Sequence, residues 1–199
     1  MPIQDLELPL RHATPRAWAE RAKARLDVFL ADHAICEMQA SLTALSLVAH
    51  YPADEELVER MTSLAIEEAS HLRKVTDLMR RRRIAPSKRR GNSYVRALRD
   101  AQRKESSSSL KLDRLLTCAL IEARSCERFS RLLAVANDDP PLTALLEELG
   151  PAERRHWEMF HRLAAREVDA PALDARWNWW LDYEAGVMEP RGTEPTVHG

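Results

Sequence analysis

Two copies of a short pattern, a glutamate followed by a histidine three residues later, recur in this sequence at a fixed distance. Each copy has a further glutamate 31 positions before it, so one set of three residues appears twice. The sets lie 85 positions apart and consist of Glu37, Glu68 and His71, and of Glu122, Glu153 and His156. A repeat of this kind predicts two related structural units.

The residue types in the two sets point to metal binding. Glutamate and histidine at positions i and i+3 share one face of a helix. Four carboxylates and two imidazoles from four helices are the ligand set of a carboxylate-bridged dinuclear iron or manganese site. Structural zinc prefers cysteine and histidine in closed tetrahedra, so this set suits Fe(II) or Mn(II) better. We expect Glu68 and Glu153 to bridge the two metals.

Each remaining ligand pair, Glu37 with His71 and Glu122 with His156, is expected to serve one metal. No catalytic residue is predicted beyond these six ligands. A single Glu-x-x-His usually lies on a solvated helix face. Here that interpretation would require six polar residues to fall on apolar helix stripes by chance, in a duplicated spacing, and the metal interpretation is therefore favoured.

The elements that carry these residues are predicted from hydrophobic periodicity and its interruptions. Long helices are expected over residues 18–50, 55–82, 110–136 and 141–167, with shorter ones near 92–104 and 171–187. Thr14 is expected to cap the first helix and Asp54 the second. We treat residues 1–199 as a single domain, with an irregular lead-in at 1–14 and a disordered tail at 189–199.

The lengths of the connections predict the topology. The first and third links between long helices are a few residues, which makes their neighbours antiparallel. The middle link, about 27 residues, is long enough to run the length of a bundle. Short, long and short links are the pattern of a ferritin-like four-helix bundle with one long crossover between helices two and three. The predicted fold class is therefore all-α, with short flanking helices.

Composition and charge exclude several classes of protein. Hydrophobic residues are 45% and charged residues 31% of the 199, values typical of a soluble globular domain. No apolar run approaches a membrane span, and no secretion signal is visible at the start. The three cysteines form no CxxC pair, which suits a reducing cytosol. We therefore expect a cytoplasmic protein with no membrane partner, either a monomer or a dimer.

A basic stretch follows the second predicted helix. Residues 80–90 read RRRRIAPSKRR and contain no acid. Arginine suits phosphate geometry, so this stretch predicts a nucleic-acid surface; the alternative is a helix C-terminus with a solvated loop. Three further arginines, at 96, 99 and 103, could extend it. The predicted contact residues are Arg80, Arg81, Arg82, Arg83, Lys88, Arg89 and Arg90.

A tryptophan cluster lies on the last predicted helix. Trp177, Trp179 and Trp180 could stack on a base, but packing of that helix against the bundle is the favoured interpretation.

With its surroundings, the ligand set resembles the bacterial tRNA 2-methylthio-isopentenyladenosine hydroxylase (MiaE) family over residues of about 10–185. The resemblance lies in the basic stretch leading into Gly91-Asn92-Ser93-Tyr94, and in the contexts Glu67-Glu68-Ala69-Ser70-His71 and Glu153-Arg154-Arg155-His156-Trp157. The six ligands alone are shared with ferritins, rubrerythrins and other di-iron oxidases.

The resemblance implies a di-iron monooxygenase. Two iron ions would be its cofactor and O₂ its co-substrate, and it would hydroxylate the isopentenyl side chain of the hypermodified adenosine next to the anticodon in tRNA. The implied partners are the anticodon arm of tRNA and an external electron-donor reductase.

Two other functions fit the sequence less well. A ferritin-like iron-handling or peroxide-reducing protein would be expected to carry further acidic entry residues or rubredoxin-type cysteines. A non-catalytic RNA-binding bundle with a structural metal would keep RNA binding after loss of the ligands and would show no O₂ chemistry.

Overall fold

The computed structural model describes residues 7–87, 92–189 and 194–198, and all regular structure within them is helical. The helices are α1 (Arg16–Ala24), α2 (Leu26–His50), α3 (Glu55–Arg81), α4 (Ser93–Asp100), α5 (Ser107–Leu133), α6 (Pro140–Ala164) and α7 (Ala170–Met188). The chain forms two compact units, which we call the hairpin unit (Arg25–Arg90) and the larger unit (Met1–Ala24 with Gly91–Gly199). The predicted single domain stays a prediction.

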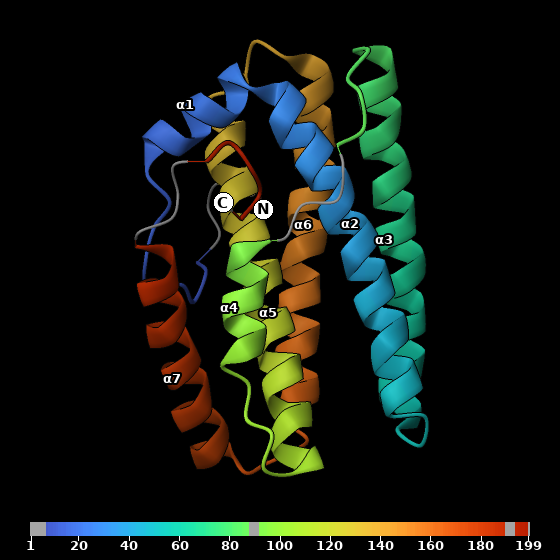
Figure 1. Cartoon of the computed structure of the whole chain (residues 1–199), viewed down its shortest axis with the longest axis vertical. Coiled ribbons are helices and arrows are strands. Elements are labelled where there is room, and N and C mark those ends of the chain that lie inside the picture. The colour runs from blue at the N-terminus through green and yellow to red at the C-terminus, as the bar shows by residue number, and fades with distance from the viewer. Residues whose placement is uncertain (1–6, 88–91, 190–193, 199) are drawn as a thin grey trace. The chain divides into compact units, whose positions relative to one another are not determined.

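The hairpin unit consists of α2 and α3, which lie side by side in antiparallel directions (Figure 1). Asp54 caps α3 as predicted, since its side chain accepts a hydrogen bond from the backbone N–H of Leu57 at 3.1 Å. The buried side of α3 follows the predicted apolar stripe, and Glu68 and His71 belong to it. The local sequence therefore turns both ligand candidates inward.

The larger unit is built on a second antiparallel hairpin, α5 and α6 (Figure 1). Helices α1, α4 and α7 all contact α5. A capping box between Ser106 and Ser109 begins α5. The short helix α4 lies in the long middle link, where a short helix was predicted.

The two hairpins repeat each other in detail. Helices α3 and α6 begin at positions 55 and 140, which are 85 apart. Like Asp54, Asp139 caps its helix, accepting from the N–H of Leu142 at 3.2 Å. The hydroxyl of Ser41 donates to the carbonyl of Ala65 at 2.9 Å, and 85 positions later the thiol of Cys126 donates to the carbonyl of Gly150 at 3.4 Å. The 85-residue repeat is thus a structural duplication.

The predicted first helix, residues 18–50, is wrong as one continuous helix. It divides into α1 and α2 at Arg25, whose φ of −125° and ψ of 50° are not helical. The side chain of Arg25 turns back to the carboxylate of Asp27, with contacts of 3.1 and 3.2 Å. Periodicity alone does not reveal such a break, because good helix-forming residues stand on both sides of it.

Thr14 does not cap the first helix as predicted. Its N–H and hydroxyl both donate to the carboxylate of Glu127 on α5, at 2.9 and 2.5 Å. A partner 113 positions away in the chain therefore takes the groups that a local cap would use.

The predicted disorder of the tail, residues 189–199, is also wrong for the buried residues that the structure describes there. Thr196, Val197 and His198 are buried, and their partners lie on α1, α4 and α5. Residues 190–193 and 199 lie outside the described residues. None of the described helices is both long and apolar enough to cross a membrane.

Candidate metal centre

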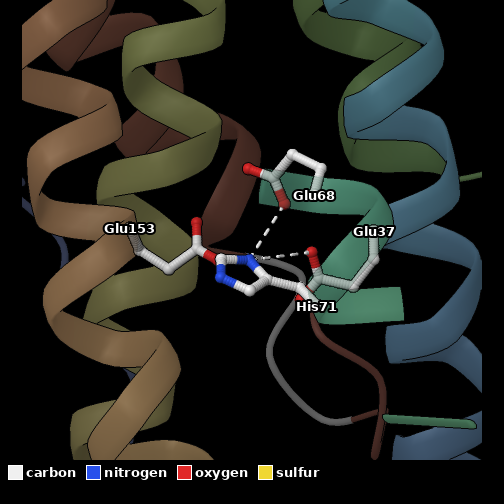
Figure 2. Close-up of side chains that lie close together, drawn as sticks. All are labelled: Glu37, Glu68, His71 and Glu153. Carbon is white, nitrogen blue, oxygen red and sulfur yellow. Dashed lines mark hydrogen bonds and ion pairs between the residues drawn. The ribbon is translucent and has the colours of Figure 1, made fainter. Parts of the chain in front are cut away.

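The hairpin unit carries the first set of three ligand candidates. Glu37 lies on α2, and Glu68 and His71 lie one turn apart on α3; all three are at most 3% exposed. Figure 2 shows the two carboxylates turned toward the ring of His71. We call this set the first half-site.

The distances within the first half-site suit a metal ligand set. The Nδ1 atom of His71 is 3.3 Å from Oε2 of Glu68 and 3.8 Å from Oε2 of Glu37 (Figure 2). Ligand atoms that share one metal at about 2.1 Å stand roughly 3 Å apart. The other ring nitrogen, Nε2, faces Oε1 of Glu67 at 3.9 Å, which is too long for a hydrogen bond.

Sequence reasoning missed one buried polar residue beside this half-site. Nε2 of His33 lies 2.6 Å from Oε1 of Glu37, and His33 is only 1% exposed. Burial lowers the pKa of His33 to about 3, helped by His71 and opposed by Glu68, so the ring is neutral and donates its N–H to Glu37. The signal was present in the sequence, because His33 precedes Glu37 by four positions and shares its helix face.

The larger unit carries the second set, which we call the second half-site. Glu122 on α5 is 7% exposed, and Glu153 and His156 on α6 are each 3% exposed. Glu122 and His156 offer ligand atoms within 4.8 Å of each other. Glu153 precedes His156 by one turn, as Glu68 precedes His71, so both half-sites share one arrangement along their helices.

The buried cation nearest in sequence to Glu122 is engaged by other carboxylates. Arg124 is two positions from Glu122 and therefore lies on a different face of α5. Its guanidinium is bound to Glu184 and Glu127. Buried carboxylates with imidazoles, in apolar surroundings, are the donors that Fe(II) takes, so the residues fit iron.

The basic stretch is described only in part. Arg80, Arg81 and Arg83 are exposed, Arg82 is half-buried, and Arg80 pairs with Asp77 at 3.1 Å. Lys88, Arg89 and Arg90 lie outside the described residues. Among the three further arginines, Arg103 donates hydrogen bonds to the buried carboxylate of Asp113. Its guanidinium therefore has a structural role.

The tryptophan cluster on α7 is engaged within the larger unit. Trp180 is fully buried and donates to Asp113 at 3.2 Å. Trp179, 41% exposed, stacks on Tyr183 at 5.3 Å and carries the guanidinium of Arg176 at 4.0 Å from its ring centre. These contacts support the packing interpretation over base stacking.

Comparison with known proteins finds one family model and two relatives that carry the same hydroxylase name. The family model described as tRNA-(MS[2]IO[6]A)-hydroxylase (MiaE) matches residues 2–199. A protein of Pseudomonas putida named tRNA 2-(methylsulfanyl)-N(6)-isopentenyladenosine(37) hydroxylase is 38% identical over 81% of this chain and 78% of its own length. A protein of the same name from Salmonella typhimurium is 28% identical over 88% of this chain and 82% of its own length.

A solved structure supports the predicted fold class. It is titled Protein 43 with aldehyde deformylating oxygenase activity from Synechococcus, and it matches with a TM-score of 0.88 and 30% identity over 96% of this chain and 95% of its own. The all-α, ferritin-like fold class is therefore confirmed.

Proposed function

Because the chain belongs to the tRNA-(MS[2]IO[6]A)-hydroxylase (MiaE) family, we propose that it hydroxylates the isopentenyl side chain of the modified adenosine next to the anticodon in tRNA. The observation that carries the proposal is the duplicated, buried set of two carboxylates and one imidazole in each hairpin. The substrate class of the proposal comes from the family, and its metal chemistry comes from the residues of the two half-sites.

We further propose that the two half-sites together hold two iron ions. One half-site offers three side chains, and carboxylates shared between the two ions would give each ion a fourth protein ligand. Glu68 and Glu153 would bridge, Glu37 and His71 would hold one ion, and Glu122 and His156 the other. The four carboxylates offset the charge of two divalent cations.

When bound, the two irons supply activation of O₂ for insertion of one oxygen atom into a C–H bond. The second oxygen atom leaves as water, which requires two electrons and two protons. An external reductase is the proposed source of these electrons. All six side chains are buried, which limits their contact with bulk water. The substrate class implies a cytoplasmic location.

The experiment loads the full-length protein with Fe(II) and supplies a chemical reductant, O₂ and isopentenylated tRNA. The tRNA is then digested to nucleosides and analysed by mass spectrometry. The expected result is one added oxygen atom on the isopentenyl nucleoside. Glu68→Ala and His156→Ala should abolish the product, whereas Glu59→Ala, an exposed glutamate on the same helix α3, should not.

The outcome separates the proposed function from the alternative classes. Two bound metals with O₂ consumption and an unmodified nucleoside would overturn the tRNA substrate and favour an iron-handling or peroxide-reducing protein. RNA binding without O₂ consumption would favour a non-catalytic RNA-binding bundle.

The basic stretch is proposed as part of the tRNA surface. Replacing Arg80, Arg81 and Arg83 together with glutamine should weaken tRNA binding and reduce the salt slope by about 0.9 for each lost phosphate contact. Arg60→Gln, an exposed arginine on the same helix, is the matched control. Equal slopes for the triple variant and the control would remove this stretch from the interface.

A further inference from the structure

The duplication allows each residue of one half-site to be compared with its equivalent in the other. The capping aspartates and the hydrogen bonds between helices coincide at the 85-residue offset. At the position four residues before the first ligand of each set, the two hairpins differ: His33 occupies it in α2 and Cys118 in α5. This position faces the carboxylate of Glu37 in one hairpin and of Glu122 in the other.

The residues at this position differ as hydrogen-bond donors. His33 holds Oε1 of Glu37 at 2.6 Å, while Oε2 of the same carboxylate points to His71. A thiol is a weak donor on a shorter side chain. The second carboxylate therefore stands beside a weaker partner.

We propose that the two metal positions are inequivalent, and that His33 is the positioning residue that makes them so by fixing the Glu37 carboxylate. This inference rests on the proposed function, because it assumes that both half-sites take a metal. With one oxygen engaged by the imidazole, the other is left to face the ion beside His71. At the equivalent position, Cys118 offers Glu122 only the weak donor of a thiol.

A fixed carboxylate has less conformational freedom to lose when the metal binds. Hydrogen-bond partners of ligands typically change metal affinity by about 10- to 100-fold. The ion held by Glu37 and His71 should thus bind more tightly than the ion held by Glu122 and His156, and the protein should load in two distinguishable steps.

The experiment titrates the metal-free, full-length protein with Co(II) alone and follows the visible absorption of the bound ion. The wild-type protein should bind two ions in two steps. His33→Leu should weaken the tighter step about tenfold or more and leave the other step unchanged. His33→Gln, which keeps a donor N–H at similar reach, should restore most of the affinity, and Cys118→Ala should change neither step by more than about threefold.

Circular dichroism shows whether each variant folds. If His33→Leu does not fold, His33→Asn replaces it, since its amide matches that of glutamine but is one carbon too short to reach Glu37. If His33→Gln loses as much Co(II) affinity as His33→Leu (or His33→Asn), packing at this position matters and the hydrogen bond does not. That result would overturn the inference. Unchanged Co(II) affinity in His33→Leu would also overturn the inference. So would a loss of Co(II) affinity in Cys118→Ala as large as that in His33→Leu.

The failure of this inference can be told apart from the failure of the proposed function. Two Co(II) ions bound by wild type, with His33→Leu unaffected, would overturn only the role of His33. Fewer than two ions bound by wild type would overturn the two-metal site itself.

Discussion

The guanidinium of Arg124 on α5 donates two hydrogen bonds to the carboxylate of Glu184 on α7, from Nε at 2.8 Å and from Nη2 at 3.0 Å, and both side chains are fully buried. The hydroxyl of Tyr94 on α4 donates to the same carboxylate at 3.2 Å. Helices α4, α5 and α7 of the larger unit therefore meet at one buried ion pair. Its arginine lies on α5, the helix that also carries Glu122.

Removing one partner of this pair should strongly destabilise the protein. Glu184→Leu leaves the Arg124 charge buried without its main acceptor, so the free energy of unfolding should fall by about 3–5 kcal/mol. Chemical denaturation followed by circular dichroism measures this change.

The double variant Arg124→Met with Glu184→Leu provides the control. It removes both charges and should recover much of the loss, because hydrophobic replacement of a buried pair is often neutral. If the double variant were no more stable than Glu184→Leu, the ion pair would stabilise the fold by more than its desolvation costs.

A second prediction concerns pH and the carboxylate of Asp113. This fully buried group accepts from Arg103, Arg176 and Trp180. Burial alone would raise the pKa of Asp113, but the hydrogen bonds from Arg176 and Arg103 outweigh it and lower the pKa below its ordinary 3.8. The folded state therefore binds fewer protons than the unfolded state as the pH falls.

The contribution of Asp113 to stability should be complete above about pH 5 and lost as the pH falls through the folded pKa. The free energy of unfolding, measured between about pH 3 and 7, should decline less steeply in Asp113→Asn than in wild type. Asp100→Asn, at an exposed position, is the control. Parallel profiles for wild type and Asp113→Asn would show that this carboxyl is not linked to folding.

Most of the fold and of the candidate site could be predicted from local patterns in the sequence. The stripes around Glu68 and Glu153 could be recognised because apolar residues recur with the helical period, and both stripes are buried in the structure. Asp54 could be recognised as a cap because its partner, Leu57, is three residues away.

The features that escaped prediction depend on partners far apart in the chain. Thr14 looked like a helix cap, but its groups are taken by Glu127, 113 positions later. His198 lies in a polar, Pro-rich tail, and nothing local indicates that its ring stacks on Tyr94. His33 is different: its partner Glu37 is one turn away, but no motif distinguishes a histidine that supports a ligand from one that packs.

A third prediction follows from the backbone at Arg83, whose φ of 57° lies in the left-handed region. There α3 ends in a Schellman motif, with the N–H of Ile84 donating to the carbonyl of Met79 at 2.9 Å. Glycine is preferred at this position, and another residue costs about 1 kcal/mol. Arg83→Gly should therefore raise the free energy of unfolding by about 1 kcal/mol while weakening tRNA binding.

Arg83→Ala separates strain from charge, because it keeps the strained backbone but removes the guanidinium. It should lose the same tRNA affinity without gaining stability. Filter binding of tRNA and chemical denaturation measure the two quantities independently. Full tRNA affinity in the glycine variant would show that Arg83 does not contact the RNA.

The last prediction concerns the buried end of the chain. The guanidinium of Arg128 on α5 donates to the carbonyls of Thr196 and Val197 at 3.1 and 2.9 Å. Nε2 of His198 lies 3.1 Å from the hydroxyl of Ser125, and the ring stacks on Tyr94 at 5.1 Å. Deleting residues 194–199 should lower the free energy of unfolding by about 3 kcal/mol or more, since Arg128 loses both acceptors and the buried side chain of Val197 is removed.

Single substitutions divide this effect into its parts. His198→Phe keeps a ring to stack on Tyr94 but loses the contact with Ser125, so it should cost about 1 kcal/mol. His198→Ala loses both contacts and should cost more. In the Ser125→Ala background, His198→Phe should add little further loss, because the shared hydrogen bond is already gone. An additive double variant would show that Ser125 and His198 act separately, and a deletion without effect would show that the tail does not stabilise α5.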